Sequence, residues 1–570
     1  MSGRRIRILL LLLLVVLVGT LLARSYLLPA RVPPQSVLLL ELAGAYAEAP
    51  PPDALARIFR RHEQTLLDLV SLLRRATKDD RIKGVVLRVG KLQIGWAKAQ
   101  DLREALVNFK ASGKRLVAYL EQEVSQGNLE YYLASVASEV YLPPDGSAPL
   151  TGLSSQFFFL GGVWEKLDIE MHVEKIREYK TFGDMLANKS MTAAHREMAN
   201  SLLDSVNQQF VGGIASARGL DDSAVQAAIN DCPITPDAFA KAHLSDGTRF
   251  LDEIREDLVG PHGKFLDAAD YEPRESGFMG FGGRPTLAVI YASGAIQSGD
   301  AGRGLSGDGV GSDNLVEAFE NAAADDAARA IVFRIDSPGG SALASDLIWR
   351  ATQMARAKKP VIVSMSDVAG SGGYYIAAGA TQIVAQPATL TGSIGVVMAR
   401  PDIRGLLAKL GVTTETITRG KYARLEDIAS GVTPDERAKM IGAMQHIYDV
   451  FVDRVAAGRN LSRERVNEIG RGRVWTGAQA KERGLVDELG GFTRAIELAK
   501  QAAGLPIDQE VRLVFYPHRK NVLERLANYV ETRSTIALPE SWQRAPAVLA
   551  PLDFPDGTML ALMAENIAIR

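Results

Sequence analysis

Cysteine is almost absent from this chain of 570 residues, which contains only Cys232. A single cysteine excludes a disulfide within the chain and any zinc site built from several thiolates. Neither sign of charge dominates, because 65 basic residues face 67 acidic ones, and no cluster of Lys or Arg points to nucleic-acid binding. Apolar residues make up 47% and aromatic residues 7%, as is typical of a globular α/β protein. The length predicts two or more domains.

Long apolar runs are also missing, apart from one at the start of the chain. Three arginines within residues 4–7 precede an uninterrupted apolar stretch over residues 8–22. If Arg24 snorkels to the interface, the stretch reaches Leu28 and about 20 residues, enough to span a bilayer. Residues 30–34 offer no clean small-x-small cleavage motif, so an uncleaved signal anchor is favoured over a cleaved signal peptide. The arginines then stay in the cytoplasm and the remainder is exported.

The rest of the chain contains two copies of one unit. "DDRIKGVVLRV" from Asp79 matches "DDAARAIVFRI" from Asp325, a shift of 246 positions (325 − 79). Tyr131 in "LEYYLASVASEVYLPPDGSAPLTG" aligns with Tyr374 in "GGYYIAAGATQIVAQPATLTG", a shift of 243 (374 − 131). Because the apolar and turn positions recur in one slowly drifting register, we infer a tandem duplication of about 240 residues.

Each copy alternates short β-branched runs with amphipathic segments. In the second copy "TLAVIYA", "AIVFRID" and "PVIVSMS" are predicted strands, separated by the helical patterns "SDNLVEAFENAAAD" and "SALASDLIWRATQMARAK". Strands that alternate with helices and are apolar on both faces indicate βαβ units around a parallel sheet. The predicted organisation is an anchor over residues 1–35, a first repeat over 36–277, a linker over 278–285, a second repeat over 286–516 and an extension over 517–570.

Two glycine-bearing turns in the second copy indicate chemistry. In "IDSPGGSALASD" a predicted strand turns at Gly339 and Gly340 and enters a helix, so backbone amides can cradle a negative charge there. In "DVAGSGGYYIAAG" the next strand turns at Ser371, and the glycines permit a tight turn that exposes the hydroxyl at a helix start. Since adjacent parallel strands end at the same edge of a sheet, the two turns are predicted to meet. Ser371 is therefore a candidate nucleophile.

Histidine does not supply an obvious base. None of the seven histidines lies in a glycine-rich turn, and His195 aligns with Glu436, which predicts a solvated helix face. A neutral lysine can activate a serine when burial lowers its pKa. Lys180 in "IREYKTFGDM" and Lys421 in "ITRGKYARLED" occupy the same repeat position, 241 residues apart (421 − 180), and their pattern does not choose between them.

The first copy has lost part of this apparatus. Asn128 stands where the second copy has Ser371, and "GKLQIG" over residues 90–95 stands where the second copy has "DSPGGS". The first copy keeps a lysine but neither the serine nor the Pro-Gly-Gly turn. Only the second copy combines all three features.

The motifs "DSPGG", "GSGGYYIA" and "TLTGSIGV", the tandem lysines and the anchor resemble the signal peptide peptidase A family, in its long two-repeat bacterial form. The resemblance covers essentially the whole chain. It implies an α/β fold with two tandem Clp-protease/crotonase-like repeats, each a spiral of ββα units, after an N-terminal membrane anchor helix. It also implies a homotetramer on the bacterial inner membrane, with the catalytic body in the periplasm.

The same resemblance implies roles for particular residues. Ser371 is the nucleophile and Lys180 the general base, while amides of Gly339, Gly340 and Gly372 form the oxyanion hole. Lys421 is the alternative base, since the corresponding lysine works in short one-repeat relatives. The implied activity is a serine endopeptidase that needs no metal or cofactor and degrades remnant signal peptides and other extended chains through an acyl-enzyme.

Two other functions are open to a chain of this kind. A crotonase-like acyl-CoA enzyme also uses backbone amides as an oxyanion hole, but such enzymes typically use carboxylates for acid–base work and need no anchor. An inactive membrane-tethered scaffold predicts loss of Ser371 or of both lysines, and all three residues are present.

Overall fold

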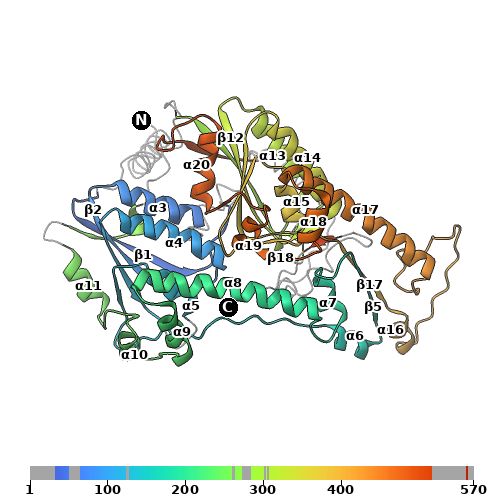
Figure 1. Cartoon of the computed structure of the whole chain (residues 1–570), viewed down its shortest axis with the longest axis horizontal. Helices are drawn as coiled ribbons and strands as arrows, with labels where there is room; N and C mark the ends of the chain where they lie inside the picture. Colours follow the sequence, from blue (N-terminus) through green and yellow to red (C-terminus); the bar gives the residue numbers. More distant parts are fainter. Residues whose placement is uncertain are drawn as a thin grey trace, which may run out of the picture.

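The computed structural model describes residues 32–49, 65–122, 127–259, 263–271, 284–300, 303–304, 307–516 and 560–562. The predicted membrane-spanning run, most of the predicted linker and most of the C-terminal extension lie outside these residues. Within the described ranges, no helix has both the length and the apolar character that crossing a membrane requires. The chain forms an N-terminal and a C-terminal α/β half, which lie side by side in Figure 1.

The N-terminal half contains the first set of strands and helices. Its strands are β1 (Ser36–Gly44), β2 (Ile82–Leu92), β3 (Arg115–Leu120), β4 (Glu139–Tyr141), β5 (Glu170–Lys175) and β6 (Phe265–Asp267). Its helices are α3 (Leu66–Lys78), α4 (Trp96–Ala111), α5 (Asn128–Ala134), α6 (Gly161–Leu167), α7 (Phe182–Ala187), α8 (Ala193–Arg218), α9 (Asp222–Asp231), α10 (Pro236–Lys241), α11 (Leu251–Leu258) and α12 (Ala268–Tyr271).

The C-terminal half contains the remaining elements. Its strands are β7 (Thr286–Ser293), β8 (Ile296–Gln297), β9 (Arg303–Gly304), β10 (Gly307–Asp308), β11 (Val310–Gly311), β12 (Ala328–Ser337), β13 (Gly339–Ser341), β14 (Val361–Gly370), β15 (Gln382–Ala385), β16 (Leu390–Gly392), β17 (Val397–Asp402), β18 (Val474–Thr476), β19 (Glu488–Leu489), β20 (Arg512–Tyr516) and β21 (Leu560–Leu562). Its helices are α13 (Ser312–Ala324), α14 (Ala342–Arg356), α15 (Gly372–Ala377), α16 (Arg404–Lys409), α17 (Pro434–Arg459), α18 (Arg463–Ile469), α19 (Gly477–Glu482) and α20 (Phe492–Ala502).

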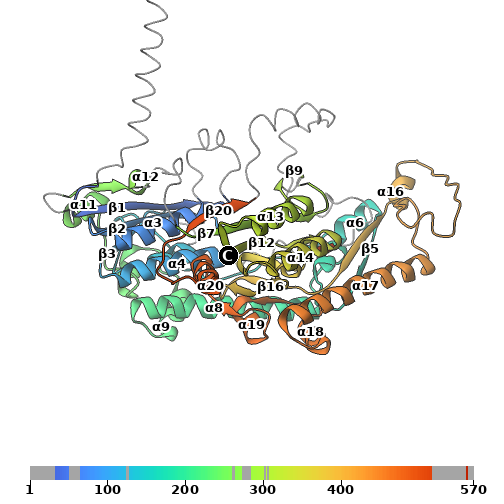
Figure 2. The ribbon, with the colours of Figure 1, turned by 90° about the horizontal axis from the view of Figure 1, so that it is seen from above.

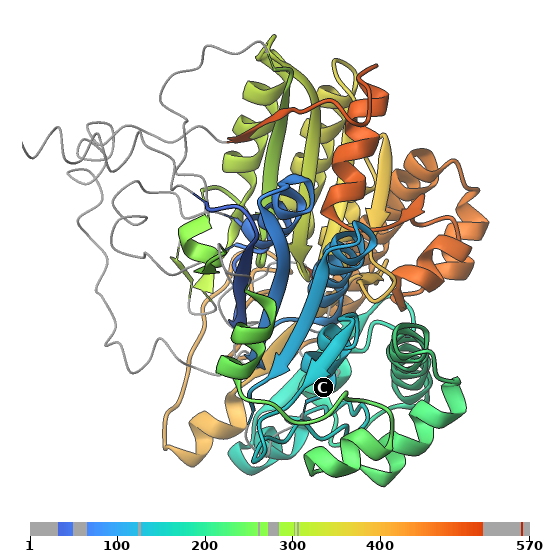
Figure 3. The ribbon, with the colours of Figure 1, turned by 90° about the vertical axis from the view of Figure 1, so that its left-hand side faces the viewer.

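The two halves repeat one strand order. Parallel strands run β4-β3-β2-β1-β6 in the first half and β15-β14-β12-β7-β20 in the second. Tyr131 Oη donates to the carbonyl of Leu244 at 2.6 Å, and Tyr374 Oη donates to that of Leu485 at 2.9 Å. The duplication seen in the sequence is thus expressed as two equivalent sheets, and the predicted α/β class with parallel strands is confirmed. Figure 3 shows the halves end-on, with the N-terminal sheet nearer the viewer.

The central strands are buried on both faces, as their sequences predict. In β12, "ARAIVFRIDS", six consecutive residues are buried, and a run of β-branched and aromatic side chains needs such cover. The longest helices also follow the repeat. Helices α8 and α17 have 26 residues each and begin after the aligned threonines Thr192 and Thr433, whose side chains accept a backbone N–H of the first turn.

A third sheet joins the two halves. Strand β5 of the N-terminal half pairs antiparallel with β17 of the C-terminal half, from Lys175 opposite Val397 to Glu170 opposite Asp402. Figures 1 and 2 show β5 at the far side of the molecule, away from the sheet of its own half. A mixed apolar cluster, including Phe182 and Val397, lies at this junction. One segment of the first repeat, strand β5, therefore packs on the second repeat.

One sequence-based expectation about this region is wrong. His195 was predicted on a solvated helix face, but it is 1% exposed, and its ring packs edge-on against Phe157 at a centroid distance of 4.6 Å. Burial lowers the pKa of His195. The alignment with Glu436 misled because that glutamate is buried as well, as part of the capping box of α17.

Candidate active site

Ser371 lies on a strained turn between β14 and α15. Its backbone has φ 52° and ψ −113°, a conformation that a residue with a Cβ rarely adopts. Its N–H donates to the carbonyl of Gly392 at 2.8 Å, which joins the turn to the end of β16. Such strain is typical of functional turns, because it aims one side chain in a fixed direction. The expectation of an exposed hydroxyl is wrong in this structure, since Ser371 is fully buried.

Lys180 reaches this serine from the other half of the chain. It follows β5, the strand that pairs with β17, and precedes α7. Its Nζ lies 2.7 Å from Ser371 Oγ, 3.1 Å from the carbonyl oxygen of Ser393 and 3.0 Å from Ser393 Oγ. The structure thus brings together two predicted site residues that are 191 positions apart.

The surroundings of Lys180 favour an uncharged amine. The residue is 1% exposed, and the hydrogen bonds of its Nζ within the described chain go to hydroxyl and carbonyl oxygens rather than to a carboxylate. Burial lowers the pKa of Lys180 well below its usual range, because removal from water disfavours the ammonium form. A neutral amine beside a serine hydroxyl is able to accept its proton.

The backbone of Lys180 is held closely by the C-terminal half. Gly472 has φ 79°, and a methyl group there would lie 2.5 Å from the backbone nitrogen of Lys180. The neighbouring Tyr179 donates its N–H to the carbonyl of Arg471 at 3.1 Å. The guanidinium of Arg473 lies 4.7 Å from the Tyr179 ring centroid and pairs with Glu197 of the first half. The position of Lys180 is therefore set by contacts between the repeats.

Ser393 is a member of this site that the sequence reasoning missed, although the motif "TLTGSIGV" was recognised. Its φ of 52° is also positive, and its N–H donates to the carbonyl of Arg473 at 2.7 Å. Comparison of the two copies would have found it: the aligned glycines Gly152 and Gly392 place Leu153 opposite Ser393. Like Ser371, it is a serine of the second copy that the first copy lacks.

Lys421 does not meet Ser371 within this chain. Its side chain is 65% exposed and pairs with Asp435 at 2.5 Å. That hydrogen bond and ion pair raise the pKa of Lys421, which keeps the ammonium charged. The counterpart of Ser371, Asn128, is buried and structural, since its Oδ1 accepts the N–H of Thr151 at 3.0 Å and its Nδ2 donates to the Gly152 carbonyl at 2.9 Å.

The predicted oxyanion glycines lie on the turns that flank Ser371. Gly339 and Gly340 form β13, where Gly339 has φ 104°, and Gly372 is the first residue of α15. The two turns touch, because a methyl group on Gly373 would lie 2.5 Å from the Ser337 carbonyl oxygen. Strand β13 pairs parallel with β8 and antiparallel with β21, which pairs in turn with β17. The glycine turn thus borders a position that already accommodates an extended strand.

Comparison with known proteins identifies the class. The family model of Peptidase family S49 matches the chain twice, over residues 108–258 and 353–506. Serine protease SPPA, chloroplastic, of Arabidopsis thaliana is 40% identical over 450 residues, 77% of this chain and 66% of that protein. Protease 4 of Salmonella typhi is 30% identical over 547 residues, 90% of this chain and 86% of that protein. These matches make the chain a serine peptidase. It belongs to Peptidase family S49, in the long two-repeat form.

Shorter and more distant proteins match in part. Putative signal peptide peptidase SppA of Enterococcus faecium is 36% identical over 191 residues, 33% of this chain and 55% of that protein. Among solved structures, a ClpP1 mutant from Listeria monocytogenes is 14% identical with a TM-score of 0.24, covering 36% of this chain and 94% of that one. That similarity is too low to assign the fold.

Proposed function

We propose that this peptidase cleaves internal peptide bonds with Ser371 as nucleophile and Lys180 as general base. The observation that carries the proposal is the 2.7 Å contact between the serine oxygen and a buried amine whose pKa is lowered by burial. Neutral Lys180 takes the serine proton as Oγ attacks the scissile carbonyl. The resulting tetrahedral oxyanion is stabilised by the amides of Gly340 and Gly372, and by that of Gly339 when its N–H leaves Ser337 Oγ, to which it donates at 3.2 Å in this structure.

The remaining steps use the same residues. The lysine ammonium gives its proton to the leaving amine nitrogen, which releases the first product and leaves an acyl-enzyme on Ser371. Lys180 then takes a proton from water as the water oxygen attacks the ester, and it returns that proton to Ser371 Oγ as the C–Oγ bond breaks and the acid product leaves, which regenerates the serine and the neutral amine. Ser393 keeps Nζ directed at the nucleophile through its hydroxyl and carbonyl oxygens.

The substrate class follows from strand pairing and from the relatives. Residues 560–562 form a strand between β13 and β17, antiparallel to both. A peptide substrate would take the same position, since an extended chain binds a sheet edge through its backbone. One relative carries the name signal peptide peptidase. We infer that the substrates are remnant signal peptides and other extended or unfolded chains.

Each repeat is assigned a Clp-protease/crotonase-like spiral of ββα units, the first over residues 36–277 and the second over 286–516. The shared strand order and the equivalent tyrosine bonds support this division. The apolar run over residues 8–22 behind three arginines supports an inner-membrane anchor with the catalytic body in the periplasm. Deletion of residues 2–31 should release the peptidase from alkali-washed membranes, and retention of the shortened chain would contradict the anchor.

The partner is a second copy of the same chain. Residues 411–416, the counterparts of β5, form no strand within the described chain, and Ile417 beside them is 88% exposed. Residues 156–161, the counterparts of β17, include Phe158, which is 59% exposed. Head-to-tail copies, closing as a homotetramer, would pair these segments and place Lys421 opposite Asn128 of the next copy. Light scattering on Ile417→Asp should show a smaller species, and an unchanged mass would contradict this arrangement.

Three variants assayed on a chromogenic peptide test the catalytic assignment. Ser371→Ala and Lys180→Ala should both abolish turnover, while Lys421→Ala should keep it. The wild-type rate should rise with pH through the lowered pKa of Lys180, since only the free amine accepts the proton. Activity in Lys180→Ala would overturn the assigned base. A wild type that does not cleave the peptide but turns over an acyl-CoA would favour the crotonase-like enzyme. A wild type that turns over neither compound would favour the scaffold.

A further inference from the structure

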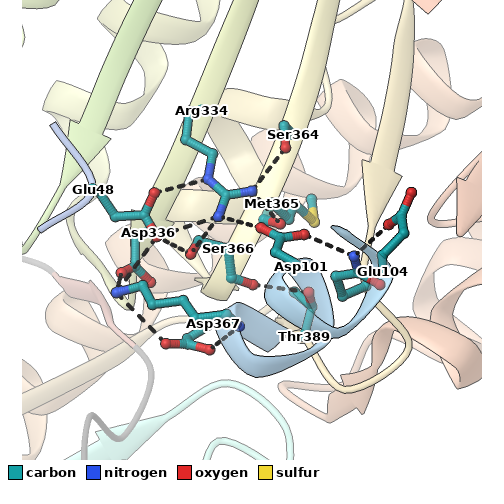
Figure 4. Close-up of polar contacts among 12 residues, drawn as sticks. Glu48, Asp101, Glu104, Arg334, Asp336, Ser364, Met365, Ser366, Asp367 and Thr389 are labelled. Carbon is teal, nitrogen blue, oxygen red and sulfur yellow. Dashed lines mark hydrogen bonds and ion pairs between the residues drawn. The ribbon is translucent and has the colours of Figure 1, made fainter. Parts of the chain in front are cut away.

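A buried ion cluster lies where β12 and β14 end, and the mechanism above does not use it (Figure 4). Seven charged residues form it, and they come from both halves of the chain. They are Glu48, Lys98, Asp101 and Glu104 of the N-terminal half, and Arg334, Asp336 and Asp367 of the C-terminal half. Five carboxylates therefore share two cations in a largely buried space.

Lys98 contacts three of these carboxylates. Its Nζ lies 2.8 Å from Asp336 Oδ2, 3.4 Å from Glu48 Oε1 and 3.6 Å from Asp367 Oδ2. Its backbone N–H also donates to Asp367 Oδ1 at 2.9 Å, and the N–H of Gly95 donates to Oδ2 at 3.1 Å. Since the cap residue Gly95 has no side chain, Asp367 caps helix α4 from the other repeat.

The two aspartates lie a few residues before the reacting turns. Asp336 precedes Gly339 of the glycine turn by three residues, and Asp367 precedes Ser371 by four. The pairing of β12 with β14 loses its register between Ile335 and Ser337, so the regular ladder does not hold the strands together there. Instead Asp336 Oδ1 accepts the N–H of Val368 at 3.1 Å. Side chains replace backbone pairing at the point where the spacing of the two turns is set.

We propose that Lys98 is a positioning residue of the peptidase, which holds the strand ends bearing the glycine turn and Ser371 at a fixed separation. The proposal rests on the function proposed above. It assigns a role to the degenerate turn of the first repeat, residues 90–95. That turn brings Gly95 so close that a methyl group there would lie 2.3 Å from Asp367 Cγ. The first repeat thus holds the strand ends that carry the candidate site of the second repeat.

The charges around Asp336 make the effect depend on pH. Burial raises the pKa of Asp336 to about 6, Lys98 opposes this rise, and Glu48 and Asp367 add to it. The charged groups that act on Asp336 are Lys98, Glu48 and Asp367, together with Arg334, which shares Glu48 with Lys98. Below about pH 6 protonation of Asp336 removes the ion pair with Lys98, so kcat should fall on the acid side. Without Lys98 the ionised carboxylate of Asp336 is less favoured. The fall of kcat on the acid side of the pH profile, its acid limb, should therefore begin at a higher pH.

The test compares kcat, KM, melting temperature and pH profile in four variants. They are Lys98→Met, Lys98→Arg, Lys98→Met with Asp336→Asn, and the control Lys114→Met, whose lysine bonds two backbone carbonyls elsewhere in the same half. Lys98→Met should lower kcat by about 10- to 100-fold, since a displacement of about 1 Å at a reacting group has that effect, with KM changed by less than about threefold. Lys98→Arg and the control should stay near wild type.

The double variant separates positioning from a general loss of structure. Asparagine at position 336 carries no charge to bury, and its oxygen still accepts from Val368. The double variant should therefore recover about tenfold of the lost kcat and lose the acid limb that Asp336 causes. Wild-type kcat in Lys98→Met, an equal loss in Lys114→Met, or no recovery in the double variant would overturn the proposal.

Two further outcomes are distinguishable. If Lys98→Met does not fold, Asp336→Asn in the wild-type background decides, because it removes the same ion pair and keeps the acceptor. A lower kcat without the acid limb supports positioning, and an unchanged profile overturns it. An active Ser371→Ala would refute the proposed function, whereas an inactive Ser371→Ala beside an unimpaired Lys98→Met would refute the positioning role alone.

Discussion

Replacing Lys180 with methionine would report the charge of the buried amine without any substrate. Methionine keeps an unbranched side chain that is one atom shorter, has sulfur in place of Cδ, and lacks the titrating nitrogen. In the folded protein, burial of the 1% exposed side chain lowers the pKa of Lys180 well below its usual range. In the unfolded chain the amine has its ordinary pKa of about 10.4. Between these two pKa values, folding releases one proton.

The size of the effect follows from that proton. In this pH window the unfolded state binds one proton more than the folded state, so the free energy of unfolding rises with pH by about 1.4 kcal/mol per unit. Burying Lys180 therefore destabilises the fold most at low pH, and the penalty disappears as pH approaches about 10.4. In Lys180→Met this contribution to the pH dependence of the free energy of unfolding is absent. The variant also loses bonds to Ser371 and Ser393, worth about 1 kcal/mol each, but that loss is independent of pH.

Urea unfolding followed by tryptophan fluorescence between pH 6 and pH 9 measures the difference. Above the lowered pKa that Lys180 has in the folded protein, the free energy of unfolding of the wild type minus that of Lys180→Met should increase by about 1.4 kcal/mol per pH unit. The same difference for Lys421→Met should stay flat in this range, since that lysine is exposed and paired with Asp435. Parallel curves for wild type and Lys180→Met would mean that Lys180 remains protonated, which would refute its role as a base.

Further predictions concern the residues around the dyad. Gly472→Ala places a methyl group 2.5 Å from the backbone nitrogen of Lys180 and should lower kcat by about 100-fold, measured on the chromogenic peptide; wild-type kcat would contradict the close packing. Ser393→Ala removes one of two bonds that direct Nζ and should lower kcat about tenfold with little change in KM, whereas a pure KM effect would contradict its role. Ala561→Pro removes a backbone N–H from the strand that pairs with Gly340, which weakens that pairing. If residues 560–562 compete with the peptide for this position, KM for the peptide should fall; an unchanged KM would exclude such competition.

Much of this site was predictable because a duplicated chain contains its own comparison. The aligned tyrosines are structural in both halves, and each bonds an equivalent carbonyl. Ser371 stood out because its counterpart is Asn128, and Ser393 would have stood out in the same way. Pattern could not choose between Lys180 and Lys421, because the two lysines have equivalent positions in their own repeats. Which one is buried depends on the antiparallel pairing of β5 with β17, a contact between segments far apart in the chain.

The same dependence explains why the first repeat persists without a nucleophile of its own. Its arm carries Lys180 to the second repeat, where Gly472 and Ser393 fix the amine against Ser371. In place of the glycine turn, the first repeat has Gly95 and Lys98, which bond to the aspartates that precede the reacting turns of the second repeat. Each of these contacts requires the second repeat as partner. On the proposed assignment, the first copy can lack the serine and the glycine turn while its surface completes the site of the second copy, since the contact between Lys180 and Ser371 joins the two repeats.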